Sequence, residues 1–200
     1  MVVSGTVGPR GDGYDSAGAP SADEAADYHA PQVAAFAAAG ADLVGAYTLT
    51  TTGEAVGIVR ACRAHGLPAA ISFTVEVDGR LPDGTTLADA VGEVDRHGAP
   101  DYFLVNCAHP EHVMAALPAS ADGDEDGDGA DWRTRLLGVR YNASTRSHGE
   151  LDEAEDLDAG DLDRIAAGHA TVAPLLPDLA VVGGCCGTGA AHVARLWGVG

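Results

Sequence analysis

The segment that most constrains this chain is VVGGCCGT, residues 181–188, in which two adjacent cysteines stand between glycines. Val181 and Val182 are β-branched and indicate the end of a buried strand. Neighbouring side chains on a strand point to opposite faces, so two adjacent thiols converge only if the backbone turns. Glycine supplies the backbone angles for such a turn. We therefore expect Cys185 and Cys186 at a strand tip, presented as a pair of ligands.

A third cysteine ends a second apolar stretch, YFLVNC at residues 102–107. This stretch predicts another buried strand, and its last residues, Asn106 and Cys107, are polar or reactive. Cys107 is therefore the candidate third ligand beside Cys185 and Cys186.

Strand and helix patterns alternate along the whole chain. Predicted strands cover residues 2–7, 41–47, 69–75, 102–107, 136–141 and 179–183, and predicted helices follow at 21–39, 54–65, 86–96, 109–116, 161–176 and 190–197. Pro31 predicts a kink or a restart in the first helix, and Gly40 its end. The alternation is typical of an α/β fold with a parallel sheet and outer helices.

The residues that can carry chemistry follow the predicted strand ends: Gly8, Thr48, Glu76, Cys107, Asn142 and Cys185. A TIM-type (β/α) barrel and a doubly wound sheet both place active sites at the carboxyl ends of their strands. Six strand–helix units are present, two fewer than a full barrel has. We expect one domain over residues 1–200, an incomplete (β/α) barrel.

Three thiolates that meet at one point suit Zn²⁺, which prefers tetrahedral soft ligands at about 2.3 Å. Three protein ligands leave the fourth position open, as in catalytic zinc sites. A metal ion deprotonates an incoming thiol, and three thiolates leave the site with a net negative charge that keeps the bound sulfur nucleophilic. The pattern favours alkyl transfer to sulfur over hydrolysis.

Two other interpretations of the cysteines stay open. Cys185 and Cys186 could form a strained vicinal disulfide, which a reducing compartment disfavours. Cys62 could be a fourth ligand of a closed structural zinc site, although its place within a predicted helix favours a core thiol. His109 and His148 fall in rim loops and could line the site.

Charge and hydropathy exclude several classes of protein. The net charge is −19 and every basic residue is Arg, so nucleic acid is not an expected partner. The chain has no apolar run long enough for a membrane span and no signal peptide, so we expect a cytoplasmic protein without membrane contact. An acidic surface without Lys fits a cytoplasm of high salt; an ordinary acidic protein is the alternative.

The acidic composition of residues 119–131 predicts a surface insert. An EF-hand calcium loop that starts at Asp122 is excluded, because its twelfth position is Arg133 where the pattern requires Glu.

The chain resembles the homocysteine S-methyltransferase family, whose homocysteine-binding (β/α)8 domain also occurs in betaine–homocysteine methyltransferases and cobalamin-dependent methionine synthases. The matching segments are GTVGP at 5–9, SFT at 72–74 with LPDGT at 81–85, VNC at 105–107, YN at 141–142 and GGCCGT at 183–188. The resemblance implies Cys107, Cys185 and Cys186 as zinc ligands, homocysteine as the thiol and methionine as the product. It makes the following residues candidates for substrate binding: Asn106, Thr48, Glu76, Asn142 and Thr188.

The chain also departs from this family. The family begins with a strand that carries Asp-Gly-Gly and a second strand, and neither is present, so we expect a barrel that lacks its first two units. The family has Glu-Thr after its fourth strand, where this chain has Tyr47 and Thr48. Glu76 could hold the substrate ammonium in place of that acid, or it is a solvated loop residue.

Two hypotheses about function follow. The first is zinc-dependent methyl transfer to the thiol of homocysteine, from a donor that the sequence does not identify. The second is a non-catalytic or partner-dependent zinc-binding fragment of such a barrel. An oligomer and a separately supplied N-terminal segment both stay open.

Overall fold

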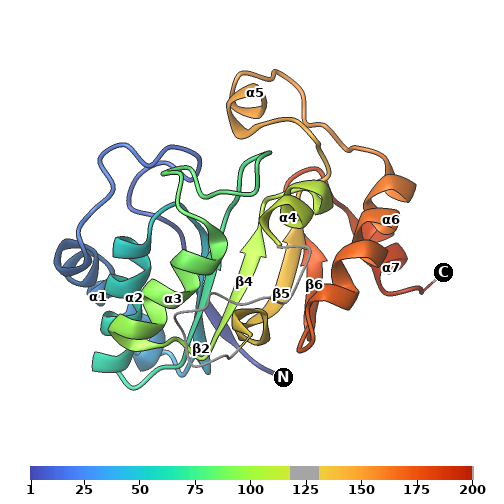
Figure 1. Ribbon diagram of the computed structural model, residues 1–200. Helices are drawn as coiled ribbons and strands as arrows, with labels where there is room; N and C mark the ends of the chain where they lie inside the picture. The colour runs from blue at the N-terminus through green and yellow to red at the C-terminus, as the bar shows by residue number, and fades with distance from the viewer. Residues whose placement is uncertain (118–130, 200) are drawn as a thin grey trace.

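A computed structural model describes residues 1–117 and 131–199 of the chain, so the predicted acidic insert lies outside the described residues except for Asp131. Six parallel strands form one sheet in chain order, β1 to β6 (Figure 1). Their bounds are Ser4–Val7, Leu43–Leu49, Ala69–Phe73, Tyr102–Asn106, Leu136–Tyr141 and Val181–Gly184. A doubly wound sheet would break this sequential order at a switch point. The prediction of a partial TIM-type barrel with six strand–helix units is therefore confirmed.

The helices pack on one side of the curled sheet except for α5, which lies above the carboxyl ends of the strands (Figure 1). They are α1 to α7, with the bounds Ala22–Ala38, Thr52–Ala64, Leu87–Gly98, Pro110–Ala116, His148–Asp152, Leu162–Val172 and Ala190–Leu196. Two short 3-10 helices cover Trp132–Arg135 and Ala173–Leu175. No helix among the described residues has the length and apolar character needed to cross a bilayer.

The first helix shows where local sequence rules hold and where they fail. Ser21 and Glu24 form the capping box that begins α1, and Gly40 follows its end with φ of +78°. The predicted restart at Pro31 is wrong, because α1 is one uninterrupted helix through this residue. Pro31 and Asp27, whose carbonyl loses its helical partner, both lie on the exposed side of α1, where water can satisfy that carbonyl.

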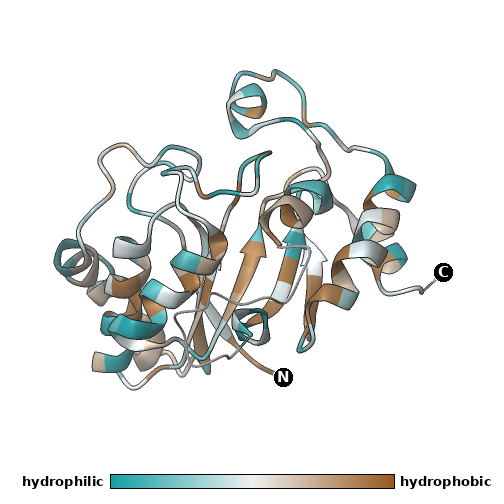
Figure 2. Ribbon diagram, viewed as in Figure 1, coloured by the Kyte–Doolittle hydropathy of each residue, from teal (hydrophilic) through white to brown (hydrophobic). Residues whose placement is uncertain are grey.

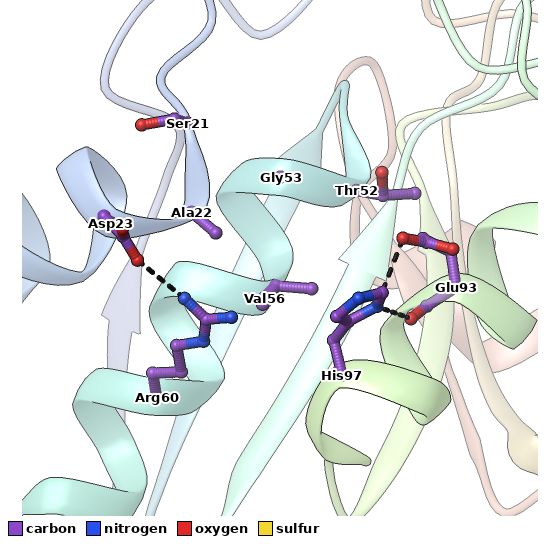
Figure 3. Close-up of a pocket in the computed structure, with 9 residues that line it drawn as sticks. All are labelled: Ser21, Ala22, Asp23, Thr52, Gly53, Val56, Arg60, Glu93 and His97. Carbon is purple, nitrogen blue, oxygen red and sulfur yellow. Dashed lines mark hydrogen bonds and ion pairs between the residues drawn. The ribbon is translucent and has the colours of Figure 1, made fainter.

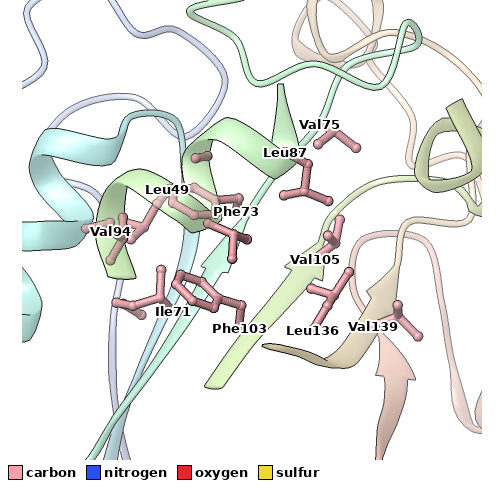
Figure 4. Close-up of a cluster of buried hydrophobic side chains, with 14 of the residues drawn as sticks. Leu49, Ile71, Phe73, Val75, Leu87, Val94, Phe103, Val105, Leu136 and Val139 are labelled. Carbon is pink, nitrogen blue, oxygen red and sulfur yellow. The ribbon is translucent and has the colours of Figure 1, made fainter. Parts of the chain in front are cut away.

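The core lies between the sheet and its helices. Figure 4 shows side chains of β2 to β5 and of α3 interlocking there, among them Phe73, Phe103 and Leu87. The rings of Phe73 and Phe103 stack with their centroids 6.2 Å apart. Hydrophobic residues accordingly gather on the strands and on the helix sides that face them (Figure 2).

Because side chains alternate along a strand, the residues between the core positions point to the inner face of the sheet, away from the helices. On β4, Phe103 and Val105 point to the helices, so Leu104 and Asn106 point inward. On β5, Val139 belongs to the same core, and the residues on either side of it point inward. The inward-pointing side chains therefore lie on the same face of the sheet, and those nearest the carboxyl ends of the strands lie next to the cysteines.

Candidate metal and thiol site

Three cysteines from the ends of two strands converge at the carboxyl edge of the sheet. The sulfur of Cys107 lies 3.4 Å from that of Cys186, and the sulfurs of Cys185 and Cys186 are 4.0 Å apart. All three sulfurs lie within 4.8 Å of one another. Every cysteine of the chain is a free thiol, and Cys62 is fully buried in the core, away from this group. We call Cys107, Cys185 and Cys186 the thiol trio.

The backbone at the end of β6 turns sharply enough to bring both of its cysteines to one side. A Cβ at Gly184 would collide with the side chain of Thr188, and a Cβ at Gly187 with the carbonyl of Asp158. The Thr188 hydroxyl donates to the carbonyl of Cys185 over 2.7 Å and closes the turn. The glycines are needed here because neither position has room for a side chain. Thr188 thus supports the turn through the backbone.

The backbone is also strained where β4 ends, close to the turn that follows β6. Cys107 has φ of +56° and Thr48, at the end of β2, has φ of +59°; these are the two non-glycine residues with positive φ in the described chain. Such backbone costs about 1–3 kcal/mol per residue and clusters at functional sites. The prediction that Thr48 follows the strand is wrong, because β2 continues to Leu49.

Asn106 holds the strained Thr48 in place. Its Oδ1 accepts from the Thr48 backbone N–H over 2.7 Å and from the Ser72 hydroxyl over 2.6 Å. Its Nδ2 donates to Oγ1 of Thr48 over 2.8 Å and points at the sulfur of Cys185, 4.0 Å away. Asn142 supplies a second amide, whose Nδ2 lies 3.7 Å from the sulfur of Cys107. Both amides can thus stabilise negative charge on sulfur.

Tyr14 covers the trio, and the sequence analysis missed it. Its hydroxyl lies 3.2 Å from the sulfur of Cys107 and 3.9 Å from that of Cys186. Its ring stacks on His148 with the centroids 4.2 Å apart and the planes 13° apart. The one signal in the sequence was an aromatic residue in the Gly- and Asp-rich loop that follows the first strand, on the rim where the cysteines lie.

The loop that carries Tyr14 is connected to the helices by a buried hydrogen bond between Glu54 and His29. Glu54 and His29, both almost fully buried, meet at 3.0 Å between Oε1 and Nε2. The same Oε1 accepts from the backbone N–H of Arg10 over 2.6 Å. This contact fixes the start of the loop and so places Tyr14.

The remaining predicted rim residues have other partners. Glu76 accepts from Nδ1 of His148 over 2.7 Å, and Nε2 of His148 lies 3.0 Å from the carbonyl of Cys107. The structure therefore brings His148 beside the trio, with Glu76 at the other ring nitrogen of His148. His109 instead accepts from the N–H of Glu111 and caps α4.

The thiols differ in proton affinity because they share hydrogen bonds. Hydrogen bonds to Cys185 and Cys186, together with burial, raise the pKa of Cys107. The hydrogen bond from Cys107 lowers the pKa of Cys186. Burial and the bond to Cys107 raise the pKa of Tyr14, which stays a neutral donor. The protein alone therefore stabilises one thiolate, and full deprotonation of the trio requires a cation.

The donor set fits a zinc ion. Tetrahedral coordination at about 2.3 Å places sulfurs about 3.8 Å apart. The separations of 3.4 and 4.0 Å in the trio bracket this value, and the third separation stays within 4.8 Å. Three thiolates are also the soft ligands that zinc selects over calcium or magnesium.

A separate hollow of about 300 Å³ lies where α1 and α2 begin, beside the end of α3 (Figure 3). Asp23 pairs there with Arg60 at 2.8 Å, and Glu93 with His97 at 3.1 Å. None of the described residues that line it is a cysteine. Its charged groups neutralise one another, so the thiol trio is the stronger candidate for chemistry.

Comparisons with known proteins agree with this geometry. A family model described as homocysteine S-methyltransferase matches residues 1–198. The homocysteine S-methyltransferase YbgG of Bacillus subtilis (strain 168) is 31% identical over 123 residues, which cover 58% of this chain and 39% of that protein. The homocysteine S-methyltransferase of Escherichia coli (strain K12) is 32% identical over 124 residues, which cover 58% of this chain and 40% of that protein. The match thus spans about 40% of the length of these curated relatives.

Solved structures give the same result for the fold. The homocysteine methyltransferase MmuM from Escherichia coli, in its oxidized form, superposes with a TM-score of 0.73 at 25% identity and covers 99% of this chain and 61% of its own. Its metallated form superposes with a TM-score of 0.66 at 26% identity, covering 98% and 60%.

Proposed function

Because the chain belongs to the homocysteine S-methyltransferase family, we propose that it transfers a methyl group to the thiol of homocysteine and yields methionine, at a zinc ion held by Cys107, Cys185 and Cys186. The observation that carries this proposal is the convergence of three free thiols within 4.8 Å at the carboxyl edge of the sheet. When bound, zinc would lower the pKa of the incoming thiol so that it is a thiolate near neutral pH.

The chain's own residues hold and orient the reacting sulfur. The amides of Asn106 and Asn142 point at the trio and stabilise its negative charge. That charge keeps the substrate sulfur electron-rich, so it attacks the methyl carbon of the donor and displaces the leaving group. Holding thiol and donor together supplies much of the rate.

Three further residues form the proposed surroundings of the substrate. Glu76, which His148 holds at the rim, has a carboxylate that can accept from the substrate ammonium. Thr48 and Thr188 shape the rim through the backbone bonds already described. The methyl donor stays open among sulfonium, betaine and methyl-corrinoid compounds.

The proposal is tested with the 200-residue chain loaded with zinc. Methionine formation from homocysteine is measured with S-methylmethionine, S-adenosylmethionine and betaine in turn, and with Cys186→Ser as the inactive variant. Cys62→Ser is the matched control, because Cys62 lies in the core outside the trio. Methionine formed by the protein and by C62S, but not by C186S, supports the proposal.

The alternative is a zinc-binding fragment that does not turn over alone. It is favoured by the open sheet, in which β1 and β6 each have one unpaired edge among the described strands. One zinc per chain without methionine from any donor would support this alternative.

We also propose a cytoplasmic setting of high salt. The four cysteines are free, as expected in a reducing compartment. Thirty acidic residues against eleven basic ones repel one another unless salt screens them.

A further inference from the structure

Arg140 is a charged side chain on the inner face of the sheet, below the thiol trio. Its neighbours on β5, Val139 and Tyr141, are both buried in the core beneath the helices. Alternation on a strand therefore points Arg140 to the opposite face, level with its register partner Asn106 on β4.

The guanidinium of Arg140 is held from two sides. Its Cζ lies over the ring of Tyr47, 4.7 Å from the centroid, and its Nε donates to the carbonyl of Gly184 over 3.4 Å. The stacking on Tyr47 and the hydrogen bond from Nε fix the plane of the guanidinium group. Its two terminal nitrogens have no hydrogen-bond acceptor among the described residues and can donate to a ligand.

Arg140 has no carboxylate partner among the described residues. Most other arginines of this acidic chain do have one: Arg60, Arg96, Arg133, Arg135, Arg146, Arg164 and Arg195 each form an ion pair. A fixed fork with free donors matches the geometry of a carboxylate.

The position of Arg140 also places it next to the thiol trio. Its carbonyl accepts from the N–H of Cys107 over 2.9 Å. Its Nε donates to the carbonyl of Gly184, the residue directly before Cys185. A carboxylate bound to Arg140 would therefore lie beside the trio.

We propose that Arg140 binds a carboxylate on the inner face, and that in catalysis this is the α-carboxylate of the amino-acid thiol. This inference rests on the proposed function and deepens it, because it makes Arg140 the residue that selects an amino acid over a simple thiol. The same chemistry could instead come from a carboxylate side chain of a polypeptide segment that packs on the open face. The experiment therefore separates the two sources.

The test compares two ligands that differ only in the carboxylate. Binding of methionine and of 3-(methylthio)propylamine is measured by calorimetry on the reduced, metal-free chain, so the result does not depend on zinc or on turnover. The variants are Arg140→Gln, Arg140→Lys and the matched control Arg96→Gln, which removes one exposed arginine on α3. We expect the protein and R96Q to prefer methionine by about 10- to 100-fold, the value of a hydrogen-bonded charge pair. R140Q should lose this preference and R140K should keep part of it.

Each other outcome has a definite meaning. If both ligands bind equally to the protein, the substrate carboxylate does not reach Arg140 and its assignment as the substrate's partner is overturned, whatever R140Q does to the unfolding temperature, because R140Q also removes the stack on Tyr47. If R140Q changes neither preference nor stability, the inference is wrong. A methionine preference that R140Q removes, in a protein that never forms methionine, would overturn the proposed function and leave the carboxylate site standing.

Discussion

The hydroxyl of Tyr14 lies 3.2 Å from the sulfur of Cys107, although 93 residues separate the two along the chain. The loop after β1 thus closes over a thiol that follows β4. Because Tyr14 also stacks on His148, its ring occupies the approach to the trio. An incoming thiol must share or displace this contact.

Replacing Tyr14 should expose the thiols. In metal-free protein, Tyr14→Ala should raise the rate at which iodoacetamide modifies Cys107, the buried thiol that Tyr14 contacts, by roughly tenfold, since the lost cover is worth about 1.4 kcal/mol. Tyr14→Phe keeps the stack and should give a smaller rise. Mass spectrometry of each thiol measures the rates, with Tyr28→Phe as the control on an exposed tyrosine. Equal rates in all four proteins would contradict this role.

Metal binding should depend on the trio and not on the fourth cysteine. Cys107→Ser, Cys185→Ser and Cys186→Ser should each bind far less than the one zinc ion expected per chain, because a hydroxyl is a poor substitute for a thiolate. Cys62→Ser should keep full zinc content. Atomic absorption after gel filtration gives the content, and the thiolate-to-cobalt absorption band of the Co²⁺ form gives the number of sulfur ligands. Full zinc in C107S would show that Cys107 is not a ligand.

Asn106→Ala should destabilise the fold by about 2–4 kcal/mol. The change leaves the Thr48 N–H and the Ser72 hydroxyl without their acceptor, and relief of backbone strain at Thr48 offsets only part of this loss. Urea unfolding measures the loss. Thr134→Ala, which removes a hydroxyl bond at the surface, should stay within about 0.5 kcal/mol of the unchanged protein. A similar small loss for N106A would mean that Asn106 does not hold Thr48.

Stability should fall as the pH drops below about 6.5, partly because of His112. Burial lowers the pKa of His112 in the folded protein, so the unfolded chain binds more protons in this range. Unfolding therefore becomes easier as pH decreases, by up to about 1.4 kcal/mol per pH unit for one such group, and the effect levels off below the folded pKa. Urea unfolding from pH 8 to 5 should show a shallower slope for His112→Gln than for the exposed control His65→Gln. Parallel slopes would exclude His112 as a source.

Molar KCl should raise the free energy of unfolding. With a net charge of −19, repulsion among carboxylates opposes the folded state until salt screens it. Denaturation in urea, with sucrose as an uncharged cosolute, separates screening from general exclusion effects. Stability that does not increase from dilute buffer to molar KCl would contradict adaptation to high salt.

Local sequence was sufficient for the elements and for the thiols. The strand and helix alternation follows from patterns within each segment, and a capping box and a left-handed glycine mark the ends of α1. Adjacent cysteines between glycines indicated a turn at a strand tip, and the structure has that turn at Cys185 and Cys186.

The contacts that complete the site depended on tertiary structure. Asn106 reaches Thr48 across 58 residues, and the guanidinium of Arg140 lies over Tyr47 although the two residues belong to different strands. The periodicity of hydrophobic residues within a segment does not predict such pairs, because they depend on the register between strands and on the curvature of the sheet. The sequence by itself therefore determined which side chains can do chemistry, whereas the packing of distant strands decided which of them meet.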